Sequence, residues 1–209
     1  MDSRPQRIGL ASYLRSHNHP GGIIVCERSK YIYMKAAKTA GTSILRGTLE
    51  QNYSDIFHFK DQPNEFQEWL DRITDEELKN YFIFSVVRNP WDRLVSVATY
   101  FKIPFKEFIR NIDFYNNELN IKVHALPLIQ YTHIGDSQFV DFICRFENLQ
   151  HDINLVFERI GINKQHLPYL NKSEHLHYSH YYTQNEIEKV RQIYKNDIKH
   201  FGYSFSSIS

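Results

Sequence analysis

The sequence predicts an α/β fold in which a parallel β-sheet is flanked by helices. Two short apolar runs, Ile23–Cys26 and Tyr31–Met34, are separated by a polar turn and have the composition of strands. A third run, at residues 81–87, is typical of a strand that helices cover on both faces. Helical spacing follows the second and third runs, and strands that alternate with helices in this way form parallel sheets.

Capping signals mark where the helices begin. Thr74 and Glu77 have the spacing of a capping box, as do Thr183 and Glu186. Asn89 is a helix cap that precedes a proline at the first helical position. These signals and the apolar spacing predict helices from about residue 42, over 66–70, after 74, over 90–100, over 147–160 and over 183–201, and a further strand over 139–146.

The chain of 209 residues is expected to form one domain that follows a short arm. Residues 1–22 show no sustained apolar period, and we expect them to be irregular. All predicted elements fall within residues 23–209, where no internal repeat or domain boundary is visible. We therefore assign residues 1–22 to an N-terminal arm and residues 23–209 to a single domain.

Composition and charge exclude several classes of protein. Apolar residues make up 42% and charged residues 23% of the chain, which excludes a disordered protein. The net charge of +1 provides no overall basic field, so nucleic acid is not an expected partner. No apolar run approaches the ~20 residues of a membrane span, and the polar start does not resemble a secretory signal. Cys26 and Cys144 lie in apolar runs and are expected to be buried free thiols, which favours a cytoplasmic location.

The first motif with chemical meaning is the loop AAKTAGTS at residues 36–43. It joins a predicted strand to a predicted helix, at the edge of an α/β sheet where ligands bind. Gly41 allows a ligand to approach the backbone closely, Thr42 and Ser43 offer hydroxyl donors, and Lys38 offers an ammonium. The loop therefore predicts a pocket for a phosphate-like dianion, the alternative being an ordinary turn with a surface lysine. It is not the nucleoside triphosphatase loop, in which the lysine follows the second glycine.

The second motif, FSVVRNPWDRLVSVATY, occupies residues 84–100. Arg88 follows the apolar strand, and Ser96 lies eight residues later on the next helix, so that both can converge on one phosphate. The alternative for Arg88 is an ion pair with Asp92. For Arg93 we expect a surface ion pair, and for Trp91 a packing role.

Together, YIYMKAAKTAGTS and FIFSVVRNPWDRLVS resemble the sulfotransferase family, in particular the branch that includes bacterial and Golgi carbohydrate sulfotransferases. The segments FICRFENL, LPYLNKSEH and YKNDIKHFGYSF are also similar to this branch, so the resemblance extends over residues 23–205. One departure is Ala37, where the family usually has proline. This change removes no ligand group.

The resemblance implies a P-loop-like nucleotide-binding fold and a nucleotide donor, 3′-phosphoadenosine 5′-phosphosulfate (PAPS), with adenosine 3′,5′-bisphosphate as product and no metal. It places Lys38 beside the leaving oxygen and Arg88 and Ser96 at the 3′-phosphate. Lys172 and Ser173 are expected to close over the nucleotide. The residues that the resemblance implies around the 5′-phosphosulfate are Lys38, Thr39, Ala40, Gly41, Thr42 and Ser43.

A histidine is the expected base for the acceptor hydroxyl. The first candidate is His58, in the loop between the two motifs where related enzymes often carry a histidine, and the second is His124. If they are not catalytic, His58 is an exposed loop residue and His124 lines the wall of the acceptor cleft. The base can also be a carboxylate. The residues His175, His177 and His180 have metal-like spacing, but we favour a polar loop over the nucleotide.

The leading hypothesis is therefore a PAPS-dependent sulfotransferase that acts on a hydroxyl of a carbohydrate or glycoconjugate. A nucleotide-dependent kinase is the alternative enzyme, but Asp92 and Asp141 are poor candidates for the metal ligand that it needs. A non-catalytic nucleotide-binding protein is the alternative from another class. The sequence identifies neither the acceptor nor the oligomeric state.

Overall fold

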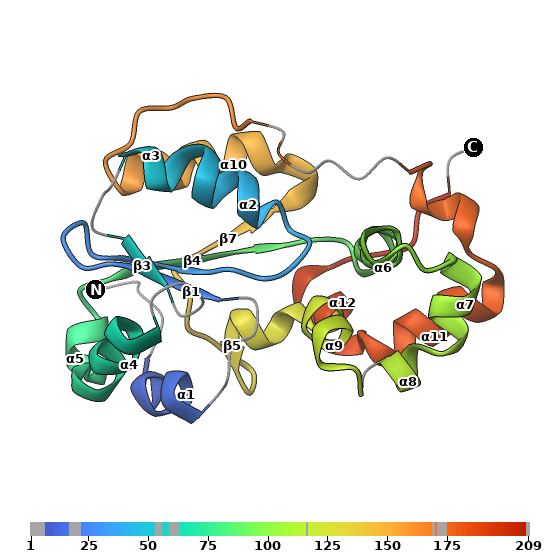
Figure 1. Cartoon of the computed structure of the whole chain (residues 1–209), viewed down its shortest axis with the longest axis horizontal. Coiled ribbons are helices and arrows are strands. Elements are labelled where there is room, and N and C mark those ends of the chain that lie inside the picture. Colours follow the sequence, from blue (N-terminus) through green and yellow to red (C-terminus); the bar gives the residue numbers. More distant parts are fainter. Residues whose placement is uncertain are drawn as a thin grey trace.

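The fold is taken from a computed structural model that describes residues 7–16, 22–52, 56–58, 63–115, 117–168, 170 and 175–207. Within these ranges, a central sheet has the strand order β3-β1-β2-β4-β7, and a small hairpin pairs β5 with β6 (Figure 1). The strands are β1 (Ile23–Cys26), β2 (Tyr31–Met34), β3 (Ile56–His58), β4 (Phe82–Val87), β5 (His133–Ile134), β6 (Ser137–Gln138) and β7 (Phe142–Arg145).

The central sheet is mostly parallel in direction. β4 pairs in parallel with both β2 and β7, whereas β1 is antiparallel to both β2 and β3. Strands β3, β2, β4 and β7 therefore run in one direction, and β1 is the reversed strand. The reversal follows from the short turn between β1 and β2, because a parallel crossover needs a dozen or more residues. The carboxyl ends of β2 and β4 thus meet at one edge of the sheet.

The helices begin close to the signals in the sequence. The two capping boxes, Thr74 with Glu77 and Thr183 with Glu186, are both present, and Asn89 caps the helix that follows it. In order, the helical elements are α1 (Leu10–Ser16), α2 (Gly41–Ile44), the π-helical η1 (Leu45–Leu49), α3 (Glu50–Asn52), α4 (Pro63–Arg72), α5 (Asp75–Leu78), α6 (Pro90–Phe101), α7 (Phe105–Arg110), α8 (Ile112–Tyr115), α9 (Leu119–Ala125), η2 (Leu128–Tyr131), η3 (Phe146–Asn148), α10 (Leu149–Arg159), η4 (Tyr178–Tyr181), α11 (Gln184–Ile193) and α12 (Lys195–Phe201).

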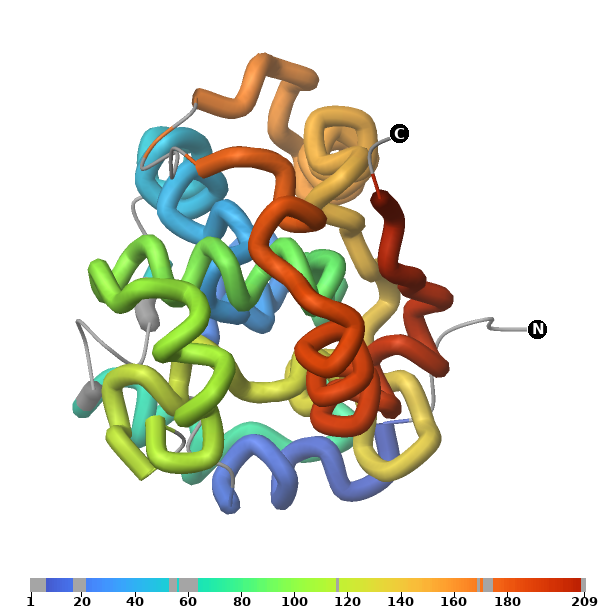
Figure 2. Tube along the Cα trace, turned by 90° about the vertical axis from the view of Figure 1, so that its right-hand side faces the viewer, coloured from blue at the N-terminus to red at the C-terminus, as the bar shows by residue number. Residues whose placement is uncertain are grey.

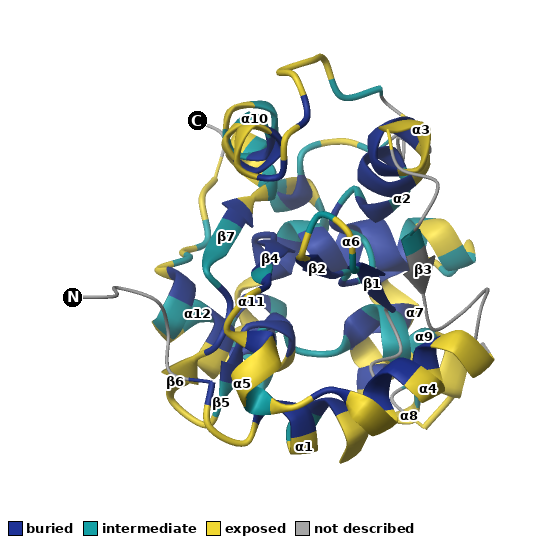
Figure 3. Ribbon diagram, turned by 90° about the vertical axis from the view of Figure 1, so that its left-hand side faces the viewer, coloured by how far each residue is buried: buried dark blue, intermediate teal, exposed yellow. Residues whose placement is uncertain are grey.

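Helices cover both faces of the sheet. Helices α2, α3 and α10 lie on one face, and α1, α4 and α5 lie on the other (Figure 1). Alternate residues along each strand serve the two layers: Ile24 and Tyr33 pack toward α10, whereas Val25 and Ile32 pack toward α4. The strands consequently form a buried layer between helices whose outer faces are exposed (Figure 3).

The remaining helices form a helical lobe beside the carboxyl edge of the sheet. Helices α6 to α9, α11 and α12 lie together on this side of the molecule, and Figure 2 views them directly. The lobe has its own apolar core around Trp91, Phe108 and Tyr194, in which Trp91 has the packing role expected of it. Among the described residues, no helix has the length and apolar character that crossing a membrane requires. Cys26 and Cys144 are buried free thiols, as predicted.

The expectation that residues 1–22 are irregular is wrong for residues 10–16. These form α1, and Leu10 and Leu14 are buried in the core below the sheet. The carboxylate of Asp75 accepts hydrogen bonds from the backbone of Gly9 (2.6 Å) and Ala11 (2.7 Å), so this helix receives its cap from a distant segment. A seven-residue helix that is capped from outside carries little local signal in the sequence.

Two further boundaries differ from the prediction. The strand expected over 139–146 is confined to β7, at Phe142–Arg145. The helix expected over 183–201 is broken at Tyr194, whose backbone (φ −105°, ψ 27°) separates α11 from α12. Its predicted end is confirmed, because Gly202 terminates α12 in the left-handed conformation (φ 65°, ψ 33°).

Candidate active site

The loop that follows β2 is held in a strained conformation. Lys38 and Ala40 both have φ near 63°, a region that non-glycine residues seldom adopt. The hydroxyl of Thr39 is completely buried and donates to the carbonyl of Ala36 (2.9 Å). Thr39 therefore stabilises the shape of the loop through its side chain.

The glycine of this loop lies under a lysine side chain that the sequence analysis did not place there. A Cβ atom at Gly41 would lie 2.8 Å from Cε and 2.9 Å from Cγ of Lys35, whose side chain passes directly over the first turn of α2. Ala40 provides no side-chain cap to this turn. Lys35 is thus a second cation at the loop, which our sequence analysis missed although it lies only three residues before Lys38.

Lys38 presents a cation at the sheet edge. Its ammonium lies 4.3 Å from the ring centroid of Tyr100, on α6. Burial, and then the charge of Arg88, lower the pKa of Lys38 to about 8. Among the residues that the structure describes, no carboxylate forms an ion pair with this ammonium, so its charge is available to an anion.

Arg88 is buried beside Lys38, at the end of β4. Its Nη1 donates to the carbonyl oxygen of Lys38 (2.9 Å), and its Nε donates to the carboxylate of Asp92 (2.7 Å). The guanidinium also lies 4.0 Å from the ring centroid of Phe146, and the residue is only 6% exposed. The ion pair with Asp92 that we considered as the alternative does form, but it is buried and orients Arg88 toward the loop.

The other predicted nucleotide contacts have different outcomes. Ser96 is buried on α6, eight residues after Arg88, and Thr42 is half-buried. The hydroxyl of Ser43 exchanges hydrogen bonds with the backbone of Leu170, donating over 3.3 Å and accepting over 3.1 Å. Lys172 and Ser173 lie outside the described residues.

The expectation of a surface ion pair for Arg93 is wrong. This residue is only 1% exposed, and its guanidinium donates to three backbone carbonyls, those of Ala37 (3.1 Å), His124 (2.9 Å) and Leu126 (2.6 Å). Asp92, its neighbour in sequence, is taken by Arg88. Because its acceptors are backbone atoms of distant segments, local sequence carries no signal for this arrangement.

His124 lies beside Lys38 at the end of α9. Its ring stacks on Tyr100 (centroids 5.2 Å apart, interplanar angle 20°) and meets Phe101 edge-on. Burial lowers the pKa of His124, and the charges of Lys38, Arg93 and Lys35 lower it further, against a hydrogen bond that raises it. That bond joins Nδ1 to the carbonyl of Asn120 (2.7 Å); since a carbonyl only accepts, Nδ1 carries the proton and Nε2 the lone pair.

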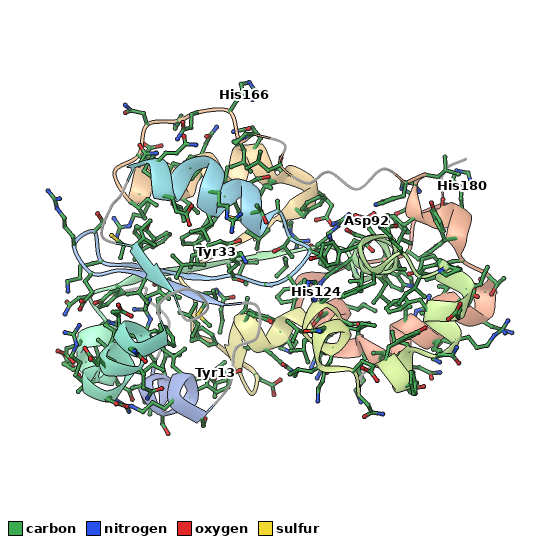
Figure 4. All side chains as sticks on the ribbon, in the orientation of Figure 1. Tyr13, Tyr33, Asp92, His124, His166 and His180 are labelled. Carbon is green, nitrogen blue, oxygen red and sulfur yellow. The ribbon has the colours of Figure 1, made fainter. Side chains whose placement is uncertain are left out.

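The other histidines are placed differently. His58 is the last residue of β3 and pairs with Ile24 of β1 through the backbone; its side chain lies outside the description. Figure 4 labels His124, between the sheet and the helical lobe, and His180, which lies far from it and is exposed. In the part of the chain that the structure describes, no three His, Cys, Asp or Glu residues are arranged to hold a metal.

Comparison with known proteins identifies the family. A model described as "Sulfotransferase family" matches residues 21–204 of the chain. This chain belongs to the sulfotransferase family. Its fold is accordingly a nucleotide-binding α/β fold, and the reaction of the family is the transfer of a sulfuryl group from a donor to a hydroxyl-bearing acceptor.

Two individual proteins are similar to this sulfotransferase. An uncharacterized protein of Archaeoglobus fulgidus is 32% identical over 106 residues, which is 46% of this chain and 83% of the relative. A crystal structure of a sulfotransferase from Alicyclobacillus acidocaldarius is matched over 94% of this chain and 90% of that one, with 15% identity and a TM-score of 0.35.

Proposed function

We propose that this protein transfers the sulfuryl group of PAPS to a hydroxyl of a carbohydrate or glycoconjugate. The observation that carries the proposal is the pair of cations, Lys38 and Arg88, at the carboxyl edge of β2 and β4, where the guanidinium of Arg88 donates to the main-chain carbonyl of Lys38. A donor with a phosphosulfate at one end and a phosphate at the other requires cations of this kind at the edge where sheet ligands bind.

The free donor groups at the edge fit such a nucleotide. Within the described ranges, the Lys38 ammonium contacts an aromatic ring rather than a carboxylate. Two of the three guanidinium nitrogens of Arg88 donate to Asp92 and to the carbonyl of Lys38. The third, Nη2, has no partner among the described residues and can donate to a phosphate. The half-buried Thr42 adds a hydroxyl in the first turn of α2.

In the proposed reaction, the base takes the proton of the acceptor hydroxyl while the new O–S bond forms. Lys38 neutralises the negative charge that grows on the phosphate oxygen as the bond between that oxygen and sulfur breaks. Arg88 and Ser96 hold the 3′-phosphate end and so keep the attacking and leaving oxygens in line. Adenosine 3′,5′-bisphosphate leaves with the electron pair of the broken bond.

We assign the base to His124. Its Nε2 has the lone pair that a base needs, and its ring shares Tyr100 with the ammonium of Lys38. Its lowered pKa favours the neutral form at pH 7. His58 is the alternative, since β3 runs in the same direction as β2 and carries this residue at its carboxyl end.

The kinase alternative is less well supported. It needs acidic metal ligands beside the phosphates, and its two candidates, Asp92 and Asp141, are engaged by Arg88 and Arg7 in buried ion pairs. A non-catalytic nucleotide-binding protein would have the same nucleotide site but would not transfer the sulfuryl group.

Calorimetric titrations and a transfer assay test the proposal. We expect adenosine 3′,5′-bisphosphate to bind in the presence of a chelator, and we expect label from [³⁵S]PAPS to appear in a glycan from a panel of carbohydrates, lipids and small alcohols. Binding of ATP with magnesium but not of adenosine 3′,5′-bisphosphate contradicts the proposal. Nucleotide binding without transfer to any acceptor favours the non-catalytic alternative, and transfer only to acceptors without sugars overturns the carbohydrate assignment.

A further inference from the structure

Arg93 connects the two segments that carry Lys38 and His124. Its Nε donates to the carbonyl of Ala37, the residue before Lys38, and its Nη2 donates to the carbonyl of His124 itself. Its Nη1 donates to Leu126, just beyond α9. One buried guanidinium therefore joins the loop after β2 to the end of α9.

A hydroxyl and a carboxylate also hold this end of α9. The hydroxyl of Tyr194 donates to the carbonyl of Ala125 (2.5 Å). The carboxylate of Asp197 accepts hydrogen bonds from the backbone of Leu128 (2.7 Å) and Ile129 (2.9 Å). The segment 124–129 is thus bound at three consecutive carbonyls and at two amides by side chains from α6, the α11–α12 junction and α12.

These bonds provide hydrogen-bond partners for carbonyl groups that have none within α9 or the residues that follow it. The last carbonyls of a helix have no partner within the helix, and Pro127 has no N–H to offer them. Helix α9 has only seven residues and no side-chain cap, so it has little stability of its own. Burial lowers the pKa of Arg93, and the neighbouring Asp197, which is also buried, offsets only part of this effect.

A second residue of helix α6, Tyr100, contacts the side chains of Lys38 and His124. Tyr100 lies seven residues after Arg93, two turns along the same face of α6. Arg93 binds backbone atoms next to Lys38 and at His124, whereas the ring of Tyr100 contacts the side chains of both. One face of α6 therefore contacts the side chains of Lys38 and His124 and also binds the backbone of His124 and of Ala37, the neighbour of Lys38.

We propose that Arg93 is a positioning residue that fixes the distance between the ammonium of Lys38 and the imidazole of His124, with Tyr194 and Asp197 also holding the segment 124–129. The consequence for catalysis rests on the proposed function. The positioning itself is a structural property and is tested without turnover.

The test variant is Arg93→Lys, which keeps the positive charge but cannot make the three hydrogen bonds of the guanidinium. The control is Arg72→Gln, which removes an exposed arginine paired with Glu27. We expect Arg93→Lys to raise the rate of amide hydrogen exchange in segment 124–129 at least tenfold. We also expect it to lower kcat at least tenfold while the Kd for adenosine 3′,5′-bisphosphate changes less than threefold. Arg72→Gln should leave all three unchanged.

Unchanged exchange in segment 124–129 or unchanged kcat in a folded Arg93→Lys protein would overturn the positioning role, as would an equal loss of nucleotide affinity and kcat. If Arg93→Lys does not fold, Tyr194→Phe decides the matter, since it removes one hydrogen bond to Ala125 and keeps the ring. Faster exchange and a lower kcat in that variant support the role, and their absence contradicts it. If the wild type binds no PAPS, the proposed function fails, whereas the exchange result still decides the positioning role.

Discussion

The Nη1 atom of Arg88 donates a hydrogen bond to the main-chain carbonyl of Lys38, over 2.9 Å, and so ties the end of β4 to the loop that follows β2. The two residues lie fifty positions apart in the chain, and parallel pairing of β2 with β4 brings their segments to the same edge. The bond explains why the two cations tolerate each other: the carbonyl dipole and Asp92 both offset the charge of Arg88.

Lys38→Met should greatly slow sulfuryl transfer and leave the fold intact. The variant removes the charge that stabilises the leaving oxygen, and loss of one such group lowers kcat by about 10²–10³-fold. Among the described residues the ammonium has a ring and no carboxylate as its partner, so the melting temperature should change little. The matched control is Lys122→Met, at an exposed position on α9. Turnover of Lys38→Met at the wild-type rate would refute the assigned role.

Arg88→Ala should weaken binding of adenosine 3′,5′-bisphosphate by about 2–3 kcal/mol, or roughly 30- to 150-fold, because a charged hydrogen bond to phosphate is lost. Isothermal titration calorimetry measures this directly. Adenosine 5′-phosphate, which lacks the 3′-phosphate, is the matched ligand and should bind the variant and the wild type with similar affinity. An equal loss for both ligands would mean that Arg88 acts on the loop rather than on the 3′-phosphate.

The activity should decline as the pH rises through about 8. The pKa of Lys38 is lowered to about 8, so the ammonium loses its proton above that pH and no longer stabilises the leaving oxygen. On the acid side, activity should fall only at a pH below the usual pKa of histidine, because burial and neighbouring cations lower the pKa of His124. A profile of kcat/KM against pH checks both limbs; a rate that is constant up to pH 10 is incompatible with a role for the charged Lys38.

Replacing each candidate base separately should distinguish them. His124→Asn should lower kcat by about 10²–10⁴-fold with nucleotide affinity retained, since proton transfer is lost and the phosphate contacts are not. His58→Asn should affect kcat by less than tenfold. The reverse result would move the assignment to His58.

The close packing of Pro168 against helix η1 should require a glycine at position 47. A Cβ at Gly47 would lie 2.4 Å from Cγ of Pro168, so Gly47→Ala should lower the free energy of unfolding by about 1–3 kcal/mol. In a Pro168→Ala background the same change should cost much less, because the obstructing ring atoms are gone. Chemical denaturation of the four proteins measures the coupling, and additive effects would show that the two residues do not meet.

Much of the fold could be predicted because its signals are local. The first two strands, both capping boxes and the left-handed end at Gly202 each depend on a few adjacent residues. Helix α1 could not be predicted, since the carboxylate that caps it belongs to Asp75.

The candidate site divides in the same way. That Lys38 and Arg88 lie together could be predicted because each belongs to a contiguous motif and both motifs end at one sheet edge. Arg93 was misjudged because it binds backbone carbonyls of distant segments, and Lys35 was missed because the sequence does not show that its side chain passes over Gly41.

A crystal structure with adenosine 3′,5′-bisphosphate tests the central claim most directly. The account predicts that the 5′-phosphate lies against the ammonium of Lys38 and the 3′-phosphate against the guanidinium of Arg88 and the hydroxyl of Ser96. A nucleotide bound at another place, or one that leaves either cation without a phosphate contact, would contradict it.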